Sequence, residues 1–412
     1  MKIPGEVLYI LDTLEAAGHE AYIVGGCVRD SLLGKYPTDW DICTAALPEQ
    51  TKECFREQRI IETGLEHGTV TLVLNHVPYE ITAYRADGKY TDGRRPDTVR
   101  FITSLKDDLS RRDFTINAMA YNPQKGFADF FDGAGDLDKG IIRCVGDPEK
   151  RLSEDALRIM RALRFACVFG FSIEENTARA MRDNAKLLGN IAAERIAVEL
   201  NKMIVGNPGV LAAHLPILTE IIPELAETQG LEKVVSSLEF APAEAAVRLA
   251  MLLRGVGAEP RGSSETALEI LQRLKYDNNT IETVTRLVLY EGADIQPDGA
   301  NIKRWLNKIG EERLRQIVAI KKADAAANEL FSPEKDLDTL NEISALTDEI
   351  IGQKQCFSLK ALAVNGKDLM AAGLTEGAEI GRVLNRLVSL VIDGQVENER
   401  TALLRRFEEL RK

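Results

Sequence analysis

The sequence of 412 residues is poor in histidine and has no closely spaced cysteines. Its four histidines are His19, His67, His76 and His214, and aspartate follows none of them. Their placement argues against a histidine–aspartate metal-dependent phosphohydrolase site. The six cysteines include no C-x-x-C pair, which gives no zinc-site spacing and favours reduced thiols in a cytoplasmic protein.

Long apolar runs and an excess of positive charge are also missing. No run reaches the length that spans a membrane, and residues 1–20 predict an amphipathic helix with acids in its apolar stretch, unlike a signal peptide. The net charge of −12 means that any nucleic-acid-binding face must be local. Basic residues cluster at 94–112, 150–164 and 303–322, and the last group is either an RNA contact or a solvated helix face.

A glycine pair follows the first predicted strand. Residues 21–24, AYIV, have the composition of a buried strand, and Gly25 and Gly26 allow a tight turn and the close approach of a bulky ligand. A short helix then opens at Val28 and carries Arg29. Because free N–H groups at a helix N-terminus attract phosphate and arginine adds a charged donor, the segment predicts a phosphate-binding turn.

Two aspartates, Asp39 and Asp41, come a few residues later in TDWDIC. A strand over residues 39–42 would point both carboxylates to one face. Two converging hard oxygen ligands suit Mg²⁺, so Asp39 and Asp41 are the candidate metal ligands and catalytic residues. A phosphate-binding turn beside a metal site predicts phosphoryl transfer by a two-metal mechanism. The alternative is a structural strand, turn and helix with surface acids.

Glu80 is the candidate for a third catalytic carboxylate. It lies among alternating apolar residues in HVPYEITAY, where an unpaired charge is costly. Pairing of Glu80 with a nearby arginine such as Arg85 is the other interpretation.

Two adjacent arginines, Arg111 and Arg112, open the segment RRDFTINAMAYNP. They suit a triphosphate, although adjacent arginines also occur as plain surface charge. Asp113 and Asn117 follow, four residues apart on a helix predicted for residues 113–120.

A second charged segment, RLSEDALRIMRALRFACVFGF, predicts a helix capped by Ser153 with acids in its first turn. One side of this helix is apolar and the other charged. The apolar side consists of Leu157, Met160 and Leu163, and the charged stripe of Asp155, Arg158, Arg161 and Arg164. Because three-residue steps drift around the helix axis, Arg164 need not reach the atom that Asp155 contacts.

Asp155 and Arg158 together could recognise a base. A carboxylate accepts and a guanidinium donates, which matches the amino group and the ring-nitrogen acceptor that cytosine and adenine both present. Uracil and guanine present a carbonyl and an N–H instead, and each good match is worth roughly 1–3 kcal/mol against the wrong base. An ion pair on a solvated helix is the alternative.

In the order and spacing of these motifs the sequence closely resembles the class II tRNA nucleotidyltransferases, the CCA-adding enzymes of bacteria, which share their catalytic head with bacterial poly(A) polymerases. The resemblance is strongest from Tyr22 to Phe171. It implies Mg²⁺ ligands at Asp39 and Asp41, with Asp155 and Arg158 forming a protein template for the incoming CTP or ATP. The nucleotide-binding residues that it implies are Gly26, Arg29, Arg112, Asp155, Arg158, Arg161 and Arg164.

Between Tyr84 and Phe101 runs a charged, glycine-containing segment that is longer than most connections in a compact domain. It is either a binding loop or a disordered surface loop. In related enzymes this loop is needed for the final A, and it looks complete here, which favours addition of all three nucleotides. The resemblance further implies a cytoplasmic enzyme that extends the 3′ end of tRNA from CTP and ATP without a nucleic-acid template or a membrane, and allows a homodimer.

The predicted fold class is α+β. Up to about Val145 short strands alternate with helices, and beyond Asp147 almost every segment predicts helix. With the resemblance, this gives a nucleotidyltransferase head with a small mixed β-sheet and flanking helices (1–145), a helical neck with the template motif (146–205), a helical body (206–335) and a helical tail that docks tRNA (336–412). Apolar residues at helical spacing between Ile380 and Val391 predict a helix packed into the core of the tail.

Three functions fit these observations. The first is a CCA-adding tRNA nucleotidyltransferase. The second is a relative with narrower output, either CC-adding, A-adding or a poly(A) polymerase, with the same catalytic residues. The third is a helical RNA-binding or chaperone protein with an inert nucleotide site, against which the intact pair Asp39 and Asp41 counts.

Overall fold

The computed structural model describes residues 1–88, 98–256, 260–327, 333–375 and 377–411. The chain divides into two compact units, Met1–Ala226 and Glu227–Lys412. The strands of the described chain all lie in the first unit, and the second is helical. The predicted α+β class is confirmed, whereas the division into head, neck, body and tail stays a prediction.

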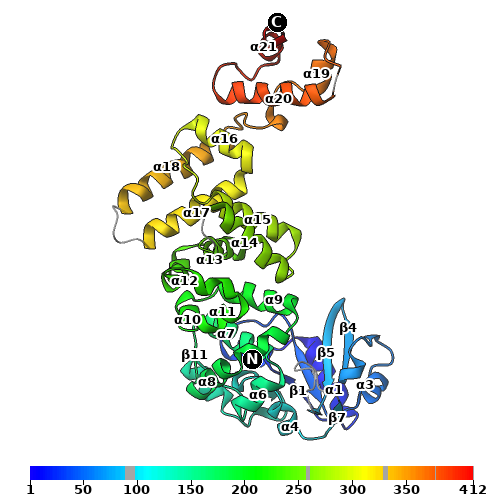
Figure 1. The fold of residues 1–412 in the computed structure, drawn as a ribbon. Coiled ribbons are helices and arrows are strands. Elements are labelled where there is room, and N and C mark those ends of the chain that lie inside the picture. The colour runs from blue at the N-terminus through cyan, green and yellow to red at the C-terminus, as the bar shows by residue number, and fades with distance from the viewer. Residues whose placement is uncertain (89–97, 257–259, 328–332, 376, 412) are drawn as a thin grey trace. The chain divides into compact units, whose positions relative to one another are not determined.

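A mixed sheet of seven strands forms the early part of the first unit (Figure 1). In spatial order its strands are β3 (Arg59–Ile61), β4 (Thr69–Leu74), β5 (Val77–Ala83), β2 (Asp41–Thr44), β1 (Ala21–Val24), β8 (Met119–Asn122) and β9 (Gly126–Asp129). β2 and β5 run parallel, and each other neighbouring pair is antiparallel. The parallel pairing sets Asp41 opposite Glu80.

The burial of each strand follows its sequence. All four residues of β1 are buried, as its apolar composition predicts, while β4 alternates between buried and half-buried residues. Tyr84 and Leu109 belong to one buried cluster on this sheet, together with Tyr22 and Val24 of β1. This core fixes the turn after β1 and the start of β2, where the predicted site lies.

Two smaller strand pairs complete the first unit. β6 (Arg85–Asp87) and β7 (Val99–Phe101) form an antiparallel ribbon, and β10 (Ile141–Ile142) pairs in parallel with β11 (Ser172–Ile173). The predicted binding loop between Tyr84 and Phe101 starts and ends in this ribbon, but residues 89–97 lie outside the described chain.

The first unit contains helices interspersed with the strands of the sheet, followed by a helical part. They are α1 (Gly5–Ala16), α2 (Gly26–Leu32), α3 (Pro48–Cys54), α4 (Leu105–Ser110), α5 (Gly133–Lys139), α6 (Pro148–Glu154), α7 (Leu157–Phe169), α8 (Glu175–Asp183), α9 (Ala193–Ile204), α10 (Pro208–Ala212) and α11 (Leu215–Ile221). On α7 the predicted apolar side is confirmed, because Leu157, Met160 and Leu163 are all buried.

Two predictions of local structure in the head are wrong. The strand predicted for residues 39–42 begins only at Asp41, so Asp39 lies in the segment that leads into β2. The helix predicted for residues 113–120 is a short 3₁₀ turn, Thr115–Asn117, followed by β8. Backbone pairing of β8 with β1 overrides the helical spacing of this segment.

The predicted Ser153 cap is also wrong. Ser153 lies inside α6 and its hydroxyl donates to the carbonyl oxygen of Lys150 at 3.0 Å. Asp155 has the extended values φ −141° and ψ 101°, which end α6, and its Oδ1 accepts from the N–H of Leu157 at 3.0 Å at the start of α7. The side chain thus competes with the helix and breaks it.

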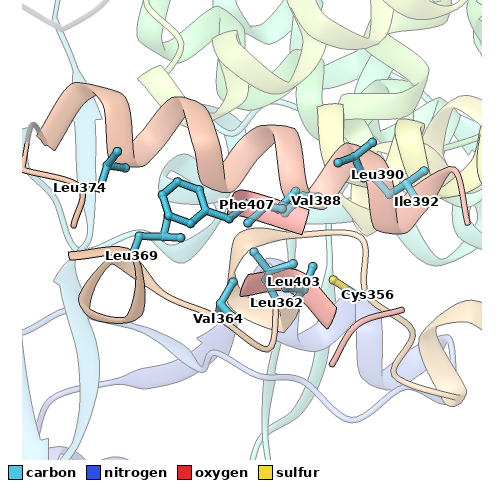
Figure 2. Packing of buried hydrophobic residues seen from close by; sticks show 11 residues of the cluster. Cys356, Leu362, Val364, Leu369, Leu374, Val388, Leu390, Ile392, Leu403 and Phe407 are labelled. Carbon is cyan, nitrogen blue, oxygen red and sulfur yellow. The ribbon is translucent and has the colours of Figure 1, made fainter. Parts of the chain in front are cut away.

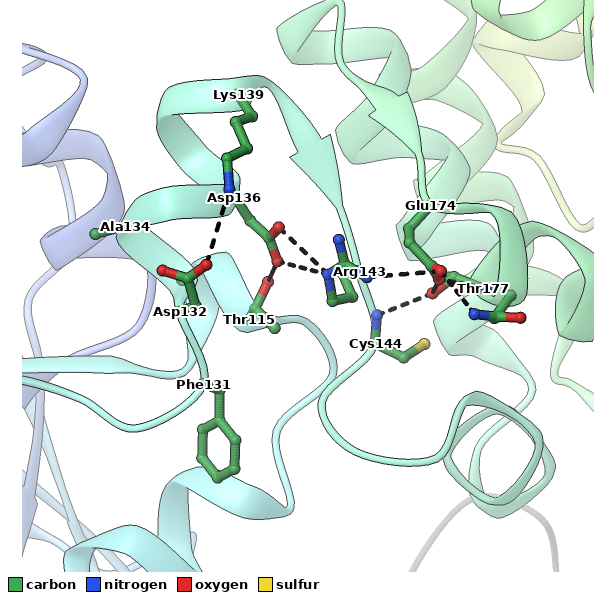
Figure 3. A network of polar contacts seen from close by, with 12 residues as sticks. Thr115, Phe131, Asp132, Ala134, Asp136, Lys139, Arg143, Cys144, Glu174 and Thr177 are labelled. Carbon is green, nitrogen blue, oxygen red and sulfur yellow. Dashed lines mark hydrogen bonds and ion pairs between the residues drawn. The ribbon is translucent and has the colours of Figure 1, made fainter.

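A polar network joins β10 to the helices that follow it (Figure 3). Asp136 is buried and accepts from the Thr115 hydroxyl at 2.7 Å and from Nε of Arg143 at 3.0 Å. Nη1 of Arg143 lies 3.5 Å from Glu174, whose other oxygen accepts from the hydroxyl of the buried Thr177 at 3.0 Å. These contacts fix the start of the helical part of the unit against α5.

The second unit consists of helices. They are α12 (Leu231–Ser237), α13 (Ala245–Leu253), α14 (Pro260–Arg273), α15 (Asn278–Tyr290), α16 (Gly299–Ile309), α17 (Glu311–Ala327), α18 (Pro333–Gly352), α19 (Gly366–Ala371), α20 (Gly377–Ile392) and α21 (Arg400–Arg411). Leu387 and Val388 of α20 pack with Leu403 and Phe407 of α21 in one buried cluster (Figure 2). The predicted amphipathic helix near the C-terminus and its packing are therefore confirmed.

Two expectations about the whole chain can be compared with the structure. All six cysteines are free thiols, as their scattered positions predict. Across the described ranges, no helix combines the length and the apolar character needed to cross a bilayer.

Candidate active site

The turn after β1 carries the first of the predicted groups. Gly25 has φ 79° and ψ −128°, a conformation that favours glycine, and its N–H donates to the carbonyl oxygen of Met119 at 3.1 Å. A Cβ atom on Gly25 would lie 3.0 Å from Nη1 of Arg112, whereas one on Gly26 would meet Nη2 of Arg29 at 3.6 Å. The close approach expected of the glycine pair therefore depends on Gly25, and Gly26 opens α2.

Acidic side chains gather at the start of β2. Asp41 is the first residue of β2 and is paired in register with Glu80 of β5, and both residues are exposed. Partial withdrawal of its carboxyl group from water is the main reason why the pKa of Asp41 is raised; the charges of Glu80 and Asp39 raise it further, and the Arg112 guanidinium opposes the rise. The three predicted acids are thus brought within electrostatic reach of one another.

The acids suit a divalent cation in their chemistry. Asp39 and Asp41 offer hard oxygen donors. Burial is the main cause of the raised pKa of Asp41, and a cation would relieve the repulsion from Glu80 and Asp39 that adds to it. Over the described part of the chain, no group of three or more acidic, histidine or cysteine side chains is arranged to hold a metal by itself. Two carboxylates alone would leave further positions on such an ion for a substrate or for water.

Arg112 lies between the glycine turn and the acids. Its Nε is buried without a hydrogen-bond partner, and its Nη2 is 3.7 Å from Oδ2 of Asp108. A half-buried guanidinium with an unsatisfied N–H group has capacity to bind an anion. Its position beside Gly25 and near Asp41 fits the prediction that it binds a triphosphate.

Arg29 does not point into an open turn. It is 8% exposed, its Nη1 donates to Oδ1 of Asn117 at 2.5 Å, and its Nε donates to Asp30 at 2.9 Å. Its guanidinium carbon lies 5.0 Å and 4.9 Å from the ring centres of Phe165 and Phe169 on α7. The structure therefore places Arg29 as a link between α2 and α7.

The predicted template residues lie at the start of α7. Between Asp155 and Arg158 the structure gives a backbone hydrogen bond of 3.0 Å rather than a side-chain ion pair. The Arg158 guanidinium instead contacts Glu154 at 3.0 Å and two backbone carbonyl oxygens at 2.9 and 3.3 Å. These bonds use three of its five N–H groups and leave two. The alternative interpretation, an ion pair between Asp155 and Arg158 on a solvated helix, is therefore wrong.

The other two arginines of the stripe are held by acids. Nε and Nη2 of Arg161 donate to Oδ2 of Asp113 at 2.8 and 2.6 Å, and Nε of Arg164 lies 2.9 Å from Glu199 on α9. The Arg164 guanidinium also stacks 3.9 Å from the centre of the Phe165 ring. Arg161 and Arg164 of the stripe thus lie beside acids of the protein rather than in open water.

Asp113 is a residue that the sequence interpretation did not assign to the site. Burial alone would raise its pKa, but the charge of Arg161 and the hydrogen bonds from Asn117 and Arg161 outweigh burial and lower the pKa of Asp113 to about 2. Asn117 donates to Asp113 at 3.0 Å and accepts from Arg29, so it connects α2 to α7. The spacing of four between Asp113 and Asn117 is the signal in the sequence, but by itself it predicts a shared helix face rather than this network.

Comparison with known protein families finds matches along most of the chain. The family described as "Poly A polymerase head domain" matches residues 21–143. The one described as "Probable RNA and SrmB- binding site of polymerase A" matches residues 170–228, and tRNA nucleotidyltransferase domain 2 matches residues 261–406.

Individual relatives match over nearly their whole length. The chain is 37% identical to the CCA-adding enzyme of Levilactobacillus brevis over 400 residues, with 96% of this chain and 95% of the relative covered. It is 39% identical to that of Limosilactobacillus fermentum, covering 98% and 96% of the two chains. Among solved structures, the Bacillus stearothermophilus CCA-adding enzyme in complex with CTP is similar with a TM-score of 0.78 and 30% identity, covering 100% of this chain and 98% of the other.

Proposed function

Because this chain belongs to the family of CCA-adding enzymes, we propose that its site adds C, C and A in sequence to the 3′ end of tRNA from CTP and ATP. The chain is a nucleotidyltransferase. The observation that carries the proposal is the meeting of Arg112, the Gly25 turn and the acids at Asp41 in one place.

In the proposed reaction, the positive and negative groups of the site have different roles. The 3′-hydroxyl of tRNA gives its proton to water, and its oxygen bonds to the α-phosphorus. The bond from that phosphorus to the bridging oxygen breaks, and pyrophosphate leaves with the electron pair of that bond. Arg112 and the N–H groups around Gly25 suit the triphosphate, which they would hold in line with the hydroxyl. Asp39 and Asp41 are proposed to lie beside the α-phosphate, with Glu80 opposite Asp41 in the register of β2 and β5.

A divalent ion is part of this proposal, and we propose Mg²⁺. Asp39 and Asp41 would hold it, with the triphosphate supplying further oxygen ligands. When bound, such an ion neutralises the triphosphate and favours ionisation of the attacking hydroxyl. Glu80 is proposed to tune the charge at Asp41, because it stands opposite Asp41 in the register of β2 and β5.

The neck residues are proposed to select the base. The hydrogen bonds of Arg158 leave two of its N–H groups for a ligand. Oδ2 of Asp155 lies 3.7 Å from Nη2 of Arg195, within ion-pair range but beyond hydrogen-bond distance, so it can still accept from a base. Together they offer donors and an acceptor to the edge that cytosine and adenine share. Arg161 and Arg164 would complete the wall of the nucleotide site, with Gly26 and Arg29 behind the phosphates. A cytoplasmic location and a homodimer stay predictions.

The test is a product-length assay on a tRNA transcript that lacks its last three nucleotides, with Mg²⁺ and CTP, ATP or both. Growth that stops at plus three with both nucleotides and ends in A supports the proposal. Growth that stops at plus two, or long tails from ATP alone, assigns the chain to the CC-adding or poly(A) branch instead. An Asp41→Asn protein run beside the wild type shows whether the growth comes from this site.

A further inference from the structure

A buried carboxylate outside the predicted site connects several of its parts. Asp108 lies in α4 and is 0% exposed. A buried carboxylate lowers the stability of the fold unless its oxygens have hydrogen-bond or ion-pair partners. The contacts of Asp108 therefore indicate its role.

The two oxygens of Asp108 are used differently. Oδ1 accepts from Nε and Nη2 of Arg111 at 3.0 and 2.9 Å and from the backbone N–H of Arg85 at 3.1 Å. Oδ2 is buried, forms no hydrogen bond, and lies 3.7 Å from Nη2 of Arg112. One oxygen is therefore saturated, while the other attracts Arg112 by charge without fully engaging it.

Arg112 also has a buried atom without a hydrogen-bond partner. Its Nε is also buried without a hydrogen-bond partner, and its Nη1 stands against the Gly25 turn. The Arg112 guanidinium is thus attracted by the charge of Asp108 through Nη2 and also interacts electrostatically with Asp41. If the role of Asp108 were only structural, we would expect its second oxygen to accept a hydrogen bond, as its first oxygen does.

We propose that Asp108 is a positioning residue for nucleotide binding, which sets Arg112 beside the Gly25 turn and leaves its N–H groups available to a triphosphate. The inference rests on the proposed function of the site. The same carboxylate accepts from Arg85 at the start of β6, so the β6–β7 ribbon and Arg112 share one anchor. Neither Asp108 nor this coupling follows from the motifs in the sequence.

Three variants separate this role from simple stabilisation. Asp108→Asn keeps the shape but replaces Oδ2 with an amide nitrogen, which offers Arg112 a donor where it had an acceptor. Asp108→Glu keeps the charge and displaces it by one methylene. Asp107→Asn makes the same charge change at the exposed neighbour in the same helix and serves as the matched control.

The measurements are the dissociation constants of CTP and ATP with Mg²⁺ in the absence of tRNA, the KM and kcat of nucleotide addition, and the melting temperature. We expect Asp108→Asn to weaken both nucleotides by about tenfold or more and Asp108→Glu by less, with tRNA affinity kept within about twofold. Asp107→Asn should match the wild type. In a double-mutant cycle, adding Asp108→Asn to Arg112→Gln should weaken nucleotide binding little further.

Some outcomes would overturn the inference while leaving the proposed function intact. Nucleotide binding by a folded Asp108→Asn protein that equals that of Asp107→Asn would mean that Asp108 is only structural. Tighter binding would mean that Asp108 holds Arg112 away from the substrate. If Asp108→Asn does not fold, wild-type nucleotide affinity in Asp108→Glu overturns the inference and a loss supports it. A wild type that adds no nucleotide would instead contradict the proposed function.

Discussion

Two regions of the candidate site differ in charge and in how that charge is partnered: the acids at the start of β2, here called the head of the site, and the arginines of α7, here called the neck. At the start of β2, Asp41 is exposed beside Glu80, and repulsion from its acidic neighbours helps to raise its pKa. On α7, Arg161 forms hydrogen bonds with Asp113, and Arg164 lies in an ion pair with Glu199 in which neither of the two close atoms makes a hydrogen bond. Among the described residues, the charge of Arg112 does not outweigh the burial and the acidic neighbours that raise the pKa of Asp41, whereas Arg161 is held by Asp113.

The difference indicates two ways of preparing a site. Acids that repel one another are poised to bind a cation, since the cation relieves an electrostatic cost already present in the fold. Arginines fixed by acids and aromatic rings lose little side-chain entropy when a nucleotide arrives, which lowers the entropic cost of binding it in one orientation. This agrees with the proposal that the acids at Asp41 take part in the reaction and that the arginines of α7 position the nucleotide.

The largest expected effect comes from removing a head acid. Asp41→Asn should lower kcat by about a thousandfold or more, because one oxygen ligand for the divalent ion and its charge are lost. The same change should raise the melting temperature of the metal-free protein at neutral pH, since the raised pKa of Asp41 marks an ionised form that the fold disfavours. Single-turnover kinetics and thermal melting measure the two effects. The exposed Asp138→Asn is the control, and a melting temperature that falls in Asp41→Asn would contradict the comparison.

The next effect concerns selection by the neck. Arg158→Lys keeps a positive charge but loses the planar fork that contacts Glu154 and two carbonyl oxygens. Discrimination for CTP and ATP over UTP and GTP should fall by up to about a hundredfold, with kcat for CTP changed less. Competition between nucleotides in the addition assay measures this ratio, with the exposed Arg179→Lys as the control. Unchanged discrimination would remove Arg158 from the template.

A third experiment tests whether the neck charges are satisfied by the protein. The pKa of Asp113 is about 2, against an ordinary value of 3.8, so its ionised form stabilises the fold above about pH 4, and this contribution is lost as the pH falls toward 2. Asp113→Asn should therefore cost about 2 kcal/mol of unfolding free energy at pH 7 and much less near pH 2. Chemical denaturation at several pH values gives the difference. A cost that does not shrink in acid would mean that Asp113 acts through packing alone.

The smallest effect concerns the turn that faces the acids. Gly25→Ala should destabilise the protein by about 1 kcal/mol or more, because φ is positive and the new Cβ would approach Arg112 at 3.0 Å. Gly26→Ala places its Cβ 3.6 Å from Arg29 at the first position of α2 and should be neutral or slightly stabilising in the free protein. Equal losses in the two variants, measured by denaturation, would mean that Gly25 is not the constrained position.

Sequence patterns predicted the parts of the site whose signal is local. The buried strand AYIV, the glycine turn and the apolar face of α7 follow from composition and spacing, and each is where it was expected. Asp41 and Glu80 were both identified, but their pairing comes from the parallel register of β2 and β5, which joins segments far apart in the chain.

The errors arose where two local structures compete. Residues 113–120 have helical spacing, but β8 is stabilised by its backbone pairing with β1, a contact that single-sequence spacing does not show. The break at Asp155 arises because an aspartate side chain can accept from the N–H two residues later, which substitutes for a helical bond. Asp108 was passed over because an acid in a charged segment looks like surface, and only the fold shows it to be buried.

The most direct test of the difference between head and neck is the effect of Mg²⁺ on thermal melting at neutral pH, in wild type and in Asp41→Asn. If the head acids are left unpaired for a divalent ion, Mg²⁺ raises the melting temperature of the wild type and has little effect on Asp41→Asn, whose own melting temperature without the ion is already higher. An equal rise with Mg²⁺ in both proteins would place the ion elsewhere and contradict the account.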